Sequence, residues 1–199
     1  MYKYFFKRFF DFWISLVVLI CISPVLLVVT VWLHFANKGA GAFFLQPRPG
    51  KNGKIFNVIK FKTMTDERDS SGNLLPDEKR LTRVGHFVRS TSLDEFPQLI
   101  NVLKGDMSLV GPRPEVRKYV DMYTTEQRRV LAVRPGITDY ASIVYMDENR
   151  LLGQSSNPDK TYVEDIMPAK IELNMRYINH PTLFEYFKLI FLTIFKIAR

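Results

Sequence analysis

Cysteine and clustered histidine are nearly absent from this 199-residue sequence. The single cysteine, Cys21, excludes an intramolecular disulfide framework. The three histidines, His34, His86 and His180, are far apart and have no cysteine beside them, so a zinc site is not expected. Internal repeats and low-complexity tracts are also absent. At this length we expect one folded core with at most a small appendage.

Acidic residues are in short supply as well. The chain has 20 Asp and Glu against 28 Lys and Arg, which gives a net charge of +8. Such an excess suits anionic partners, namely phospholipids, nucleic acids or phosphorylated metabolites. No nucleic-acid-binding motif is recognisable, so we expect no nucleic-acid partner.

One long apolar run, residues 12–35, stands out against this background. It is long enough to cross a bilayer, which takes about 20 apolar residues. Ser23-Pro24 lies near its middle, and proline removes a backbone donor and clashes with the preceding turn, so a kink is expected there. The Ser23 hydroxyl could satisfy a backbone group that the break sets free.

Basic residues flank this run on both sides: Lys3, Lys7 and Arg8 before it, and Lys38, Arg48, Lys51 and Lys54 after it. The positive-inside tendency places both flanks on the cytoplasmic side. A helix that enters the membrane, breaks at Ser23-Pro24 and returns satisfies this constraint, and a simple kinked span is the alternative. We therefore predict that residues 1–37 form a re-entrant membrane helix of a monotopic protein.

The last segment, residues 182–199, has the pattern of an aromatic-rich, cationic helix. Its few charges cannot cover a full helix circumference, so an apolar face needs a partner. We expect this amphipathic helix either to lie in the membrane interface or to pack on the core or on a second subunit. A homodimer is left open.

Residues 38–181 have the mixed pattern of a soluble domain. Two predicted strands, 43–46 and 55–64, are separated by a turn rich in Pro, Gly and Asn, so a β-hairpin is expected. Lys60 and Lys62 share one face of the second strand and could hold phosphates, although a solvated strand face is the plainer interpretation.

Helical spacing dominates the remaining chain. We predict a mobile loop at 65–80, helices at 92–103, 116–133 and 168–178, a strand at 107–110, a Pro-Gly turn at 134–138 and loop-rich chain at 146–165. The expected fold class is therefore α+β and helix-dominated.

Asp94 and Glu95 are adjacent where the helix at 92–103 should begin. Ser92 and Glu95 match a capping box, while Pro97 would allow a start nearer Glu95. Neighbouring helical residues diverge by about 100°, so the two carboxylates should not share a proton and two separate roles are expected. A capping box without chemistry is the structural alternative.

Arg113 lies between Pro112 and Pro114, which hold the backbone extended. Such a rigid segment can pre-place a guanidinium for bidentate phosphate binding. Arg134 precedes a second Pro-Gly segment and is added to the candidate phosphate-binding residues.

Several blocks in fixed order resemble the small monotopic phosphoglycosyl transferases of the bacterial sugar transferase family. The matching segments are Gln46-Pro47-Arg48-Pro49-Gly50, Lys60-Phe61-Lys62-Thr63-Met64, Leu81-Thr82-Arg83-Val84-Gly85, the run 89–101, the run 104–115 and Arg134-Pro135-Gly136-Ile137-Thr138. No single block is decisive, but the ordered set behind a proline-broken apolar helix is specific.

The resemblance implies transfer of a sugar-1-phosphate from a UDP-sugar to a polyprenol (undecaprenyl) phosphate, with release of UMP. This reaction begins bacterial glycan assembly on the cytoplasmic face of the inner membrane. The partners implied are the UDP-sugar, the polyprenol phosphate and membrane lipid.

The resemblance also assigns roles to residues. Asp94 is the implied nucleophile, which forms a covalent aspartyl phospho-sugar, and Glu95 helps to hold Mg²⁺. The family's basic positions fall on Lys60, Lys62, Arg89 and Arg113. Many members have arginine where this chain has Lys62. The chain departs from the family pattern after Thr138, which bears on sugar specificity.

Two other interpretations compete with this one. A metal-dependent lipid-phosphate phosphatase would use the same carboxylates but would make no lipid-linked product. A non-catalytic adaptor that binds anionic lipid would explain the charge and the apolar helix, but not the Asp94-Glu95 pair or the prolines around Arg113.

Overall fold

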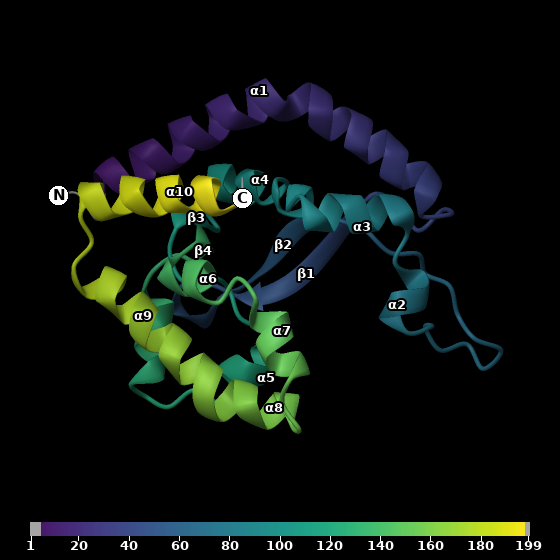
Figure 1. The fold of residues 1–199 in the computed structure, drawn as a ribbon. Coiled ribbons are helices and arrows are strands. Elements are labelled where there is room, and N and C mark those ends of the chain that lie inside the picture. The colour runs from purple at the N-terminus through teal and green to yellow at the C-terminus, as the bar shows by residue number, and fades with distance from the viewer. Residues whose placement is uncertain (1–4, 198–199) are drawn as a thin grey trace.

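A computed structural model describes residues 5–197. Met1–Tyr4 and Ala198–Arg199 lie outside the described residues, and with them Lys3 and the outer ends of both predicted terminal segments. A long helix arches over one side of the molecule, and the rest of the chain forms a body beneath it (Figure 1). Helices outweigh two small sheets, which confirms the helix-dominated α+β class.

The helices are α1 (Lys7–Ala36), α2 (Asp77–Arg80), α3 (Arg83–Ser90), α4 (Gln98–Lys104), α5 (Arg117–Val120), α6 (Tyr140–Val144), α7 (Glu148–Gly153), α8 (Pro158–Thr161), α9 (Met167–Asn179) and α10 (Leu183–Ile197). The strands are β1 (Phe43–Pro49), β2 (Ile55–Phe61), β3 (Ser108–Val110) and β4 (Gly136–Thr138). Shorter turns of helix lie at Lys51–Gly53, Leu93–Glu95, Gln127–Ala132 and Tyr162–Ile166.

The predicted β-hairpin is confirmed. β1 and β2 pair antiparallel from Phe43↔Phe61 to Pro49↔Ile55. The first strand is longer than predicted because a two-stranded sheet leaves each strand one free edge, which tolerates Pro47 and Pro49. The second strand ends at Phe61, so Lys62 lies just beyond it.

Within residues 134–138, predicted to be a turn, Gly136–Thr138 form a strand of the second sheet instead. β3 and β4 pair in parallel, with Ser108 opposite Gly136. The strands approach so closely that a Cβ on Gly136 would lie 2.2 Å from the nitrogen of Gly111. Glycine at this position is therefore required by backbone contact rather than by a turn.

Helix α1 continues through Pro24 but is bent, as the arch in Figure 1 shows. Because Pro24 has no N–H, the carbonyl of Ile20 loses its usual donor. The Ser23 hydroxyl donates to this carbonyl at 2.8 Å, as the sequence had suggested.

Both ends of α1 are tied to the body by buried polar side chains. At the first end, Asp11 accepts hydrogen bonds from the Ser108 hydroxyl (3.0 Å), the Leu109 N–H (2.9 Å) and the Tyr186 hydroxyl (3.0 Å). At the other end, the Asn37 amide donates to the carbonyls of Gly41 (2.8 Å) and Lys62 (2.6 Å).

Helix α10 packs on the core through one face. Tyr186 and Leu189 are fully buried with Val102, Met107 and Val110. The opposite face exposes apolar side chains, namely Leu183, Phe184, Phe187, Phe191, Ile194 and Phe195. Of the two expectations for this segment, packing on the core is therefore confirmed for one face.

Two further predicted segments differ from the structure. Residues 116–133 are not one helix, because α5 ends at Val120 and a separate helical turn covers Gln127–Ala132. Residues 146–165 are not loop-rich, because α7, α8 and a π-helical turn occupy most of them. Their apolar residues Leu152 and Tyr162 pack together with Tyr119, Ile166 and Met167. This contact joins distant segments, and local spacing does not reveal it.

Candidate active site

Asp94 and Glu95 lie in a short 3₁₀ turn between α3 and α4. The predicted capping box is wrong. Ser92 has a left-handed backbone conformation (φ 55°) and its side chain makes no capping hydrogen bond. Helix α4 begins only at Gln98, after Pro97. The two carboxylates are therefore not used to cap a helix and are available for other contacts.

Glu95 is held by two cations from other parts of the chain. Its carboxylate accepts from Lys60 Nζ at 3.0 Å and forms a two-pronged ion pair with Arg113, one arm of which measures 2.8 Å. Burial alone would raise the pKa of Glu95, but Arg113 and Lys60 outweigh it and lower the pKa to about 2. Glu95 is thus a fixed anion.

Asp94 has the opposite surroundings. It makes no ion pair with any described residue, and burial together with the charge of Glu95 raises the pKa of its carboxyl group. Lys60 and Arg89 counteract part of this rise through their positive charge. A partly desolvated carboxylate that is not pinned by an ion pair is suited to act as a nucleophile.

Arg89 is oriented by Thr63, a residue that the sequence did not single out. The guanidinium Nε donates to the Thr63 hydroxyl at 2.8 Å, and its terminal nitrogens donate to no other described residue. Thr63 is buried because Gly85 of α3 packs directly on its backbone. The sequence block 81–85, which ends at Gly85, therefore positions Arg89 through Thr63.

Asp139 is a second positioning residue that the sequence did not reveal. It is almost fully buried and accepts from the Arg113 backbone N–H at 2.8 Å and from the Ser142 N–H at 2.5 Å, where it caps α6. An Asp just before a helix was the available signal. Asp139 thus fixes the backbone of Arg113, whose side chain holds Glu95.

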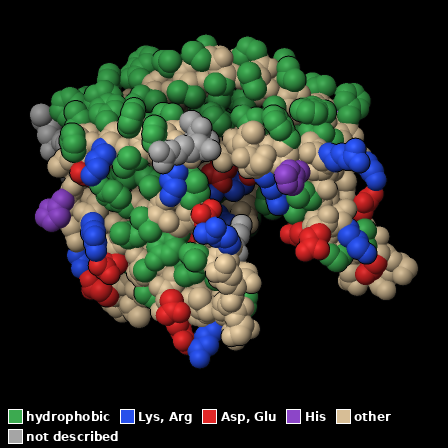
Figure 2. Space-filling model, viewed as in Figure 1, with side chains coloured by type: hydrophobic (Ala, Val, Ile, Leu, Met, Phe, Trp, Pro, Cys, Tyr) green, Lys and Arg blue, Asp and Glu red, His purple; other side chains and the backbone are tan. Residues whose placement is uncertain are grey.

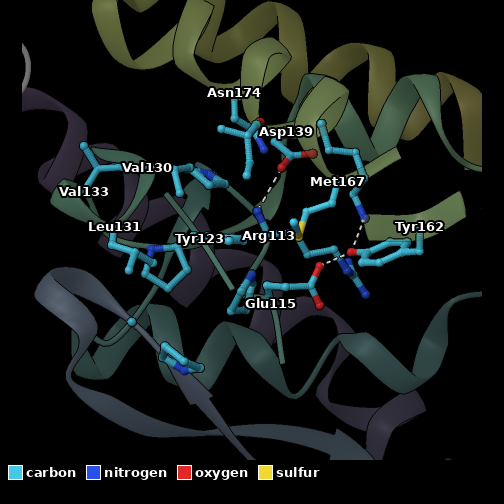
Figure 3. Close-up of a pocket in the computed structure, with 17 residues that line it drawn as sticks. Arg113, Glu115, Tyr123, Val130, Leu131, Val133, Asp139, Tyr162, Met167 and Asn174 are labelled. Carbon is cyan, nitrogen blue, oxygen red and sulfur yellow. Dashed lines mark hydrogen bonds between the residues drawn. The ribbon is translucent and has the colours of Figure 1, made fainter. Parts of the chain in front are cut away.

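A small pocket lies beside the backbone of Arg113 (Figure 3). Its volume is about 40 Å³, which suits ordered water rather than a sugar ring. Glu115 in its wall accepts a hydrogen bond from the Tyr162 hydroxyl, and burial together with the charge of Glu115 raises the pKa of Tyr162. Arg48 also pairs with Glu115 at 3.7 Å, so the pocket joins β1 to the helices that follow Arg113.

Asn101 ties the carboxylate turn to the hairpin. It is fully buried on α4, and its side chain accepts from the Ile59 N–H at 3.0 Å and donates to the Asn57 carbonyl at 2.8 Å. These two bonds occupy the free edge of β2. They set the distance between Lys60 on that strand and Glu95 before the helix.

Two predicted phosphate-binding residues do not join this group. Lys62 pairs with Asp66 at 2.5 Å. The Arg134 guanidinium donates to the Gly105 carbonyl at 2.8 Å, at the other end of α4. The structure therefore brings together Asp94, Glu95, Lys60, Arg89 and Arg113, and separates Arg134 from them.

The residues present fit only a sparsely coordinated metal ion. Within the described residues no group of three or more His, Cys, Asp and Glu side chains could hold one. Asp94 and Glu95 are two carboxylates in one turn, and Mg²⁺ is often bound by one or two carboxylates together with substrate phosphates. The donor set is thus compatible with Mg²⁺ that arrives with a diphosphate.

The chain matches the family model described as "Bacterial sugar transferase" over residues 2–199. It is 43% identical over 191 residues to the uncharacterized sugar transferase EpsL of Bacillus subtilis, covering 96% of this chain and 86% of that protein.

Other relatives carry the name of an activity, and two of them are described here. The UDP-glucose:undecaprenyl-phosphate glucose-1-phosphate transferase of Klebsiella pneumoniae is 38% identical over 196 residues, which are 96% of this chain and 40% of that protein. The UDP-N-acetylgalactosamine-undecaprenyl-phosphate N-acetylgalactosaminephosphotransferase of Aeromonas hydrophila is 34% identical over 197 residues, 96% of this chain and 43% of that protein. The chain thus spans less than half the length of these two relatives.

The family model matches nearly the whole chain. This agrees with the site geometry, in which the ordered sequence blocks supply two carboxylates and the three cations around them. This chain belongs to the bacterial sugar transferase family.

Proposed function

We propose that this protein transfers a sugar-1-phosphate from a UDP-sugar to undecaprenyl phosphate through a covalent intermediate on Asp94. The observation that carries the proposal is the unequal pair of carboxylates. Glu95 is held by ion pairs with Lys60 and Arg113, whereas Asp94 forms no ion pair with any described residue and its pKa is raised. The names of the two enzymatic relatives supply the substrate classes.

In the first step, an Asp94 carboxylate oxygen attacks the phosphorus that bears the sugar. The bond from this phosphorus to the bridging oxygen breaks, and UMP leaves with the electron pair. The product is an aspartyl phospho-sugar, a known use of carboxylate nucleophiles. Arg89 is placed to stabilise charge on the transferring group, since its terminal nitrogens have no other described partner.

In the second step, an oxygen of undecaprenyl phosphate attacks the same phosphorus and the Asp94 carboxylate leaves. The sugar–oxygen bond never breaks, so the anomeric configuration is retained. Glu95 would help to hold Mg²⁺, which supplies charge neutralisation to the diphosphate when bound.

The proposed setting is the cytoplasmic face of the bacterial inner membrane. Within residues 5–197, α1 is the one helix long and apolar enough to cross a bilayer. Its middle exposes large apolar side chains such as Val17, Ile20, Leu27 and Val28, and Figure 2 shows hydrophobic side chains gathered along this surface with charged ones beneath. Because both ends return to one body through Asp11 and Asn37, a re-entrant helix is favoured over a span.

The direct test is incubation of the purified protein with UDP-sugar labelled in the sugar phosphate, without lipid acceptor. We expect labelled protein and one UMP per active site, and transfer of the label to lipid when undecaprenyl phosphate is added. Free phosphate or sugar phosphate without lipid product would instead indicate the phosphatase.

Asp94→Asn is the matched variant for this test. We expect it to lose the labelling and to lower turnover by a factor on the order of 10⁴. Because burial disfavours the ionised Asp94, the neutral amide should leave thermal stability unchanged or raise it. Turnover that survives in this folded variant would show that the nucleophile is another residue.

A further inference from the structure

Two arginines meet at the C-terminal end of α4, away from Asp94. Arg8 of α1 donates to the carbonyls of Val102 (2.5 Å) and Leu103 (2.9 Å). Arg134 donates through Nε to the carbonyl of Gly105 at 2.8 Å. Both contacts satisfy carbonyl groups that a helix end leaves free. They use both terminal nitrogens of Arg8 but neither terminal nitrogen of Arg134.

Positive charge is in excess at this end. Lys104 and Arg134 are exposed, and Arg134 forms no ion pair with any described residue. Counting Lys7, Arg8, Lys104 and Arg134 against the neighbouring Asp11 and Asp106, four cations face two anions. The Asp106 carboxylate lies 3.3 Å from Lys104 Nζ, and the buried Asp11 carboxylate pairs with Lys7. Neither carboxylate therefore neutralises Arg134.

An apolar hollow opens beside these cations. It is lined by Phe5, Phe9, Phe12 and Trp13 together with Arg8, and its volume is about 290 Å³. All four aromatic side chains are exposed, Phe5 just before α1 and the other three on its first turns. Aromatic side chains next to cations are typical of the membrane interface. The hollow and the exposed cations together have the amphipathic character of a lipid.

This place is distinct from the active site. The seven residues of α4 separate it from the turn that carries Asp94 and Glu95, a length of about 10 Å at ~1.5 Å per residue. The Lys60, Arg89 and Arg113 side chains all contact groups at the other end.

We infer that Arg134 and Lys104 bind the phosphate of an anionic phospholipid of the bilayer whose acyl chain lies in the hollow of Phe5, Phe9, Phe12 and Trp13. The inference rests on the proposed membrane placement of α1 and not on the transferase chemistry. Such a lipid would hold the first end of α1 at headgroup depth. It also gives a function to the Arg134 guanidinium, which is exposed and lies outside the catalytic group.

The test uses the fluorescence of Trp13, which becomes the only tryptophan in a Trp32→Phe background. The full chain is reconstituted in phosphatidylcholine bilayers with a minor fraction of brominated lipid, either phosphatidylcholine or phosphatidylglycerol. Bromine quenches a tryptophan that its acyl chain contacts. We expect stronger quenching by brominated phosphatidylglycerol.

The variants are Arg134→Gln, Lys104→Gln and the two combined. Each lost cation should lower the preference for phosphatidylglycerol roughly fivefold, whereas Arg134→Lys should keep most of it. Lys160→Gln, on α8 at the opposite side of the body (Figure 1), is the matched control and should change nothing. Unchanged quenching by brominated phosphatidylcholine confirms that each variant is folded and inserted.

The outcomes separate this proposal from the one it rests on. No quenching by either lipid would overturn the membrane placement. Equal quenching by both in the parent protein would overturn the headgroup site alone. If undecaprenyl phosphate displaces brominated phosphatidylglycerol, the hollow takes the lipid substrate and the phospholipid assignment is wrong.

Discussion

Asp94 and Glu95 are neighbours in the chain, but their carboxylates differ in electrostatic state. The pKa of Glu95 is lowered to about 2 because Arg113 and Lys60 outweigh its burial. The pKa of Asp94 is raised because burial and the charge of Glu95 outweigh Lys60 and Arg89. Such a separation of two titratable groups is a frequent mark of divided catalytic roles.

A pH prediction follows for Arg89. In the proposed mechanism Asp94 must be ionised to attack, so the rate of protein labelling should fall as the pH drops through its pKa. Because Arg89 lowers the pKa of Asp94, Arg89→Gln should raise this pKa. The acidic limb of the pH–rate profile, where the labelling rate falls with falling pH, should then move to higher pH. The measurement is the rate of protein labelling against pH.

Two further variants control this experiment. Arg89→Lys keeps the positive charge and should leave the acidic limb near that of the parent. Glu95→Gln removes the neighbouring anion and should move the limb to lower pH. If the acidic limb of Arg89→Gln is unchanged, Arg89 does not set the pKa of Asp94. Its contact with Thr63 would then be its only supported role.

At the scale of elements, the junction between α3 and the end of β2 places Arg89. A Cβ on Gly85 would lie 1.9 Å from the Thr63 carbonyl oxygen, so backbone atoms would have to move. We expect Gly85→Ala to destabilise the fold by about 3 kcal/mol, the upper end for an overpacked site.

Gly153 is the matched control for Gly85. It ends α7, and no atom lies within 4 Å of the position that an alanine methyl group would occupy there. Gly153→Ala should stabilise the protein by about 0.5 kcal/mol through the unfolded chain. The measurement is thermal unfolding in detergent micelles, and similar melting temperatures for the two variants would contradict the close packing of α3 on Thr63.

Helix α1 gives a second prediction at this scale. Pro24→Ala restores a donor for the Ile20 carbonyl, so the bend should relax. A straight helix of this length measures about 45 Å at ~1.5 Å per residue, enough to cross the bilayer and carry its first end to the far side. In the proposed setting at the inner membrane, the Phe5→Cys thiol, in a Cys21→Ser background, should then become reactive to an impermeant thiol reagent added outside spheroplasts.

Ser23→Ala is the companion variant. It keeps Pro24 and the bend but leaves the Ile20 carbonyl without its donor, at a cost of about 1–3 kcal/mol. The cysteine at position 5 should stay protected in this variant. If the cysteine is protected in Pro24→Ala as well, the contacts at the two ends of α1, and not the bend at Pro24, decide the membrane topology of the helix.

At the scale of the whole molecule, one buried carboxylate joins three distant parts of the chain. Asp11 of α1 accepts from β3 through Ser108 and Leu109 and from α10 through Tyr186. Asp11→Ala would leave these donors unpaired in the core and should cost about 3–5 kcal/mol. Detergent-solubilised protein should show a lower melting temperature and easier proteolysis near α1.

Ser15, one helical turn further along, supplies the control. Its hydroxyl is fully buried and has no partner among the described residues. Ser15→Ala removes an unsatisfied polar group and should be neutral or stabilising. A large loss of stability in Ser15→Ala would show that the first end of α1 is held by close packing rather than by the Asp11 hydrogen bonds.

Local signals in the sequence were sufficient for features whose cause is local. Alternation and turn residues predicted the hairpin, helical spacing predicted α9, and Pro24 predicted the bend with its Ser23 hydroxyl. The residue types of the site, an Asp-Glu pair with nearby cations, were likewise readable from composition and order.

Only the tertiary structure decided how these groups combine. Glu95 pairs with Lys60 and Arg113, which are 35 and 18 positions away, instead of capping α4, and Arg134 lies at the other end of that helix. Asp139 and Thr63 act as positioning residues because the fold buries them against Arg113 and Arg89. Burial and pairing between distant residues depend on how elements pack, and the spacing within any one segment does not contain that information.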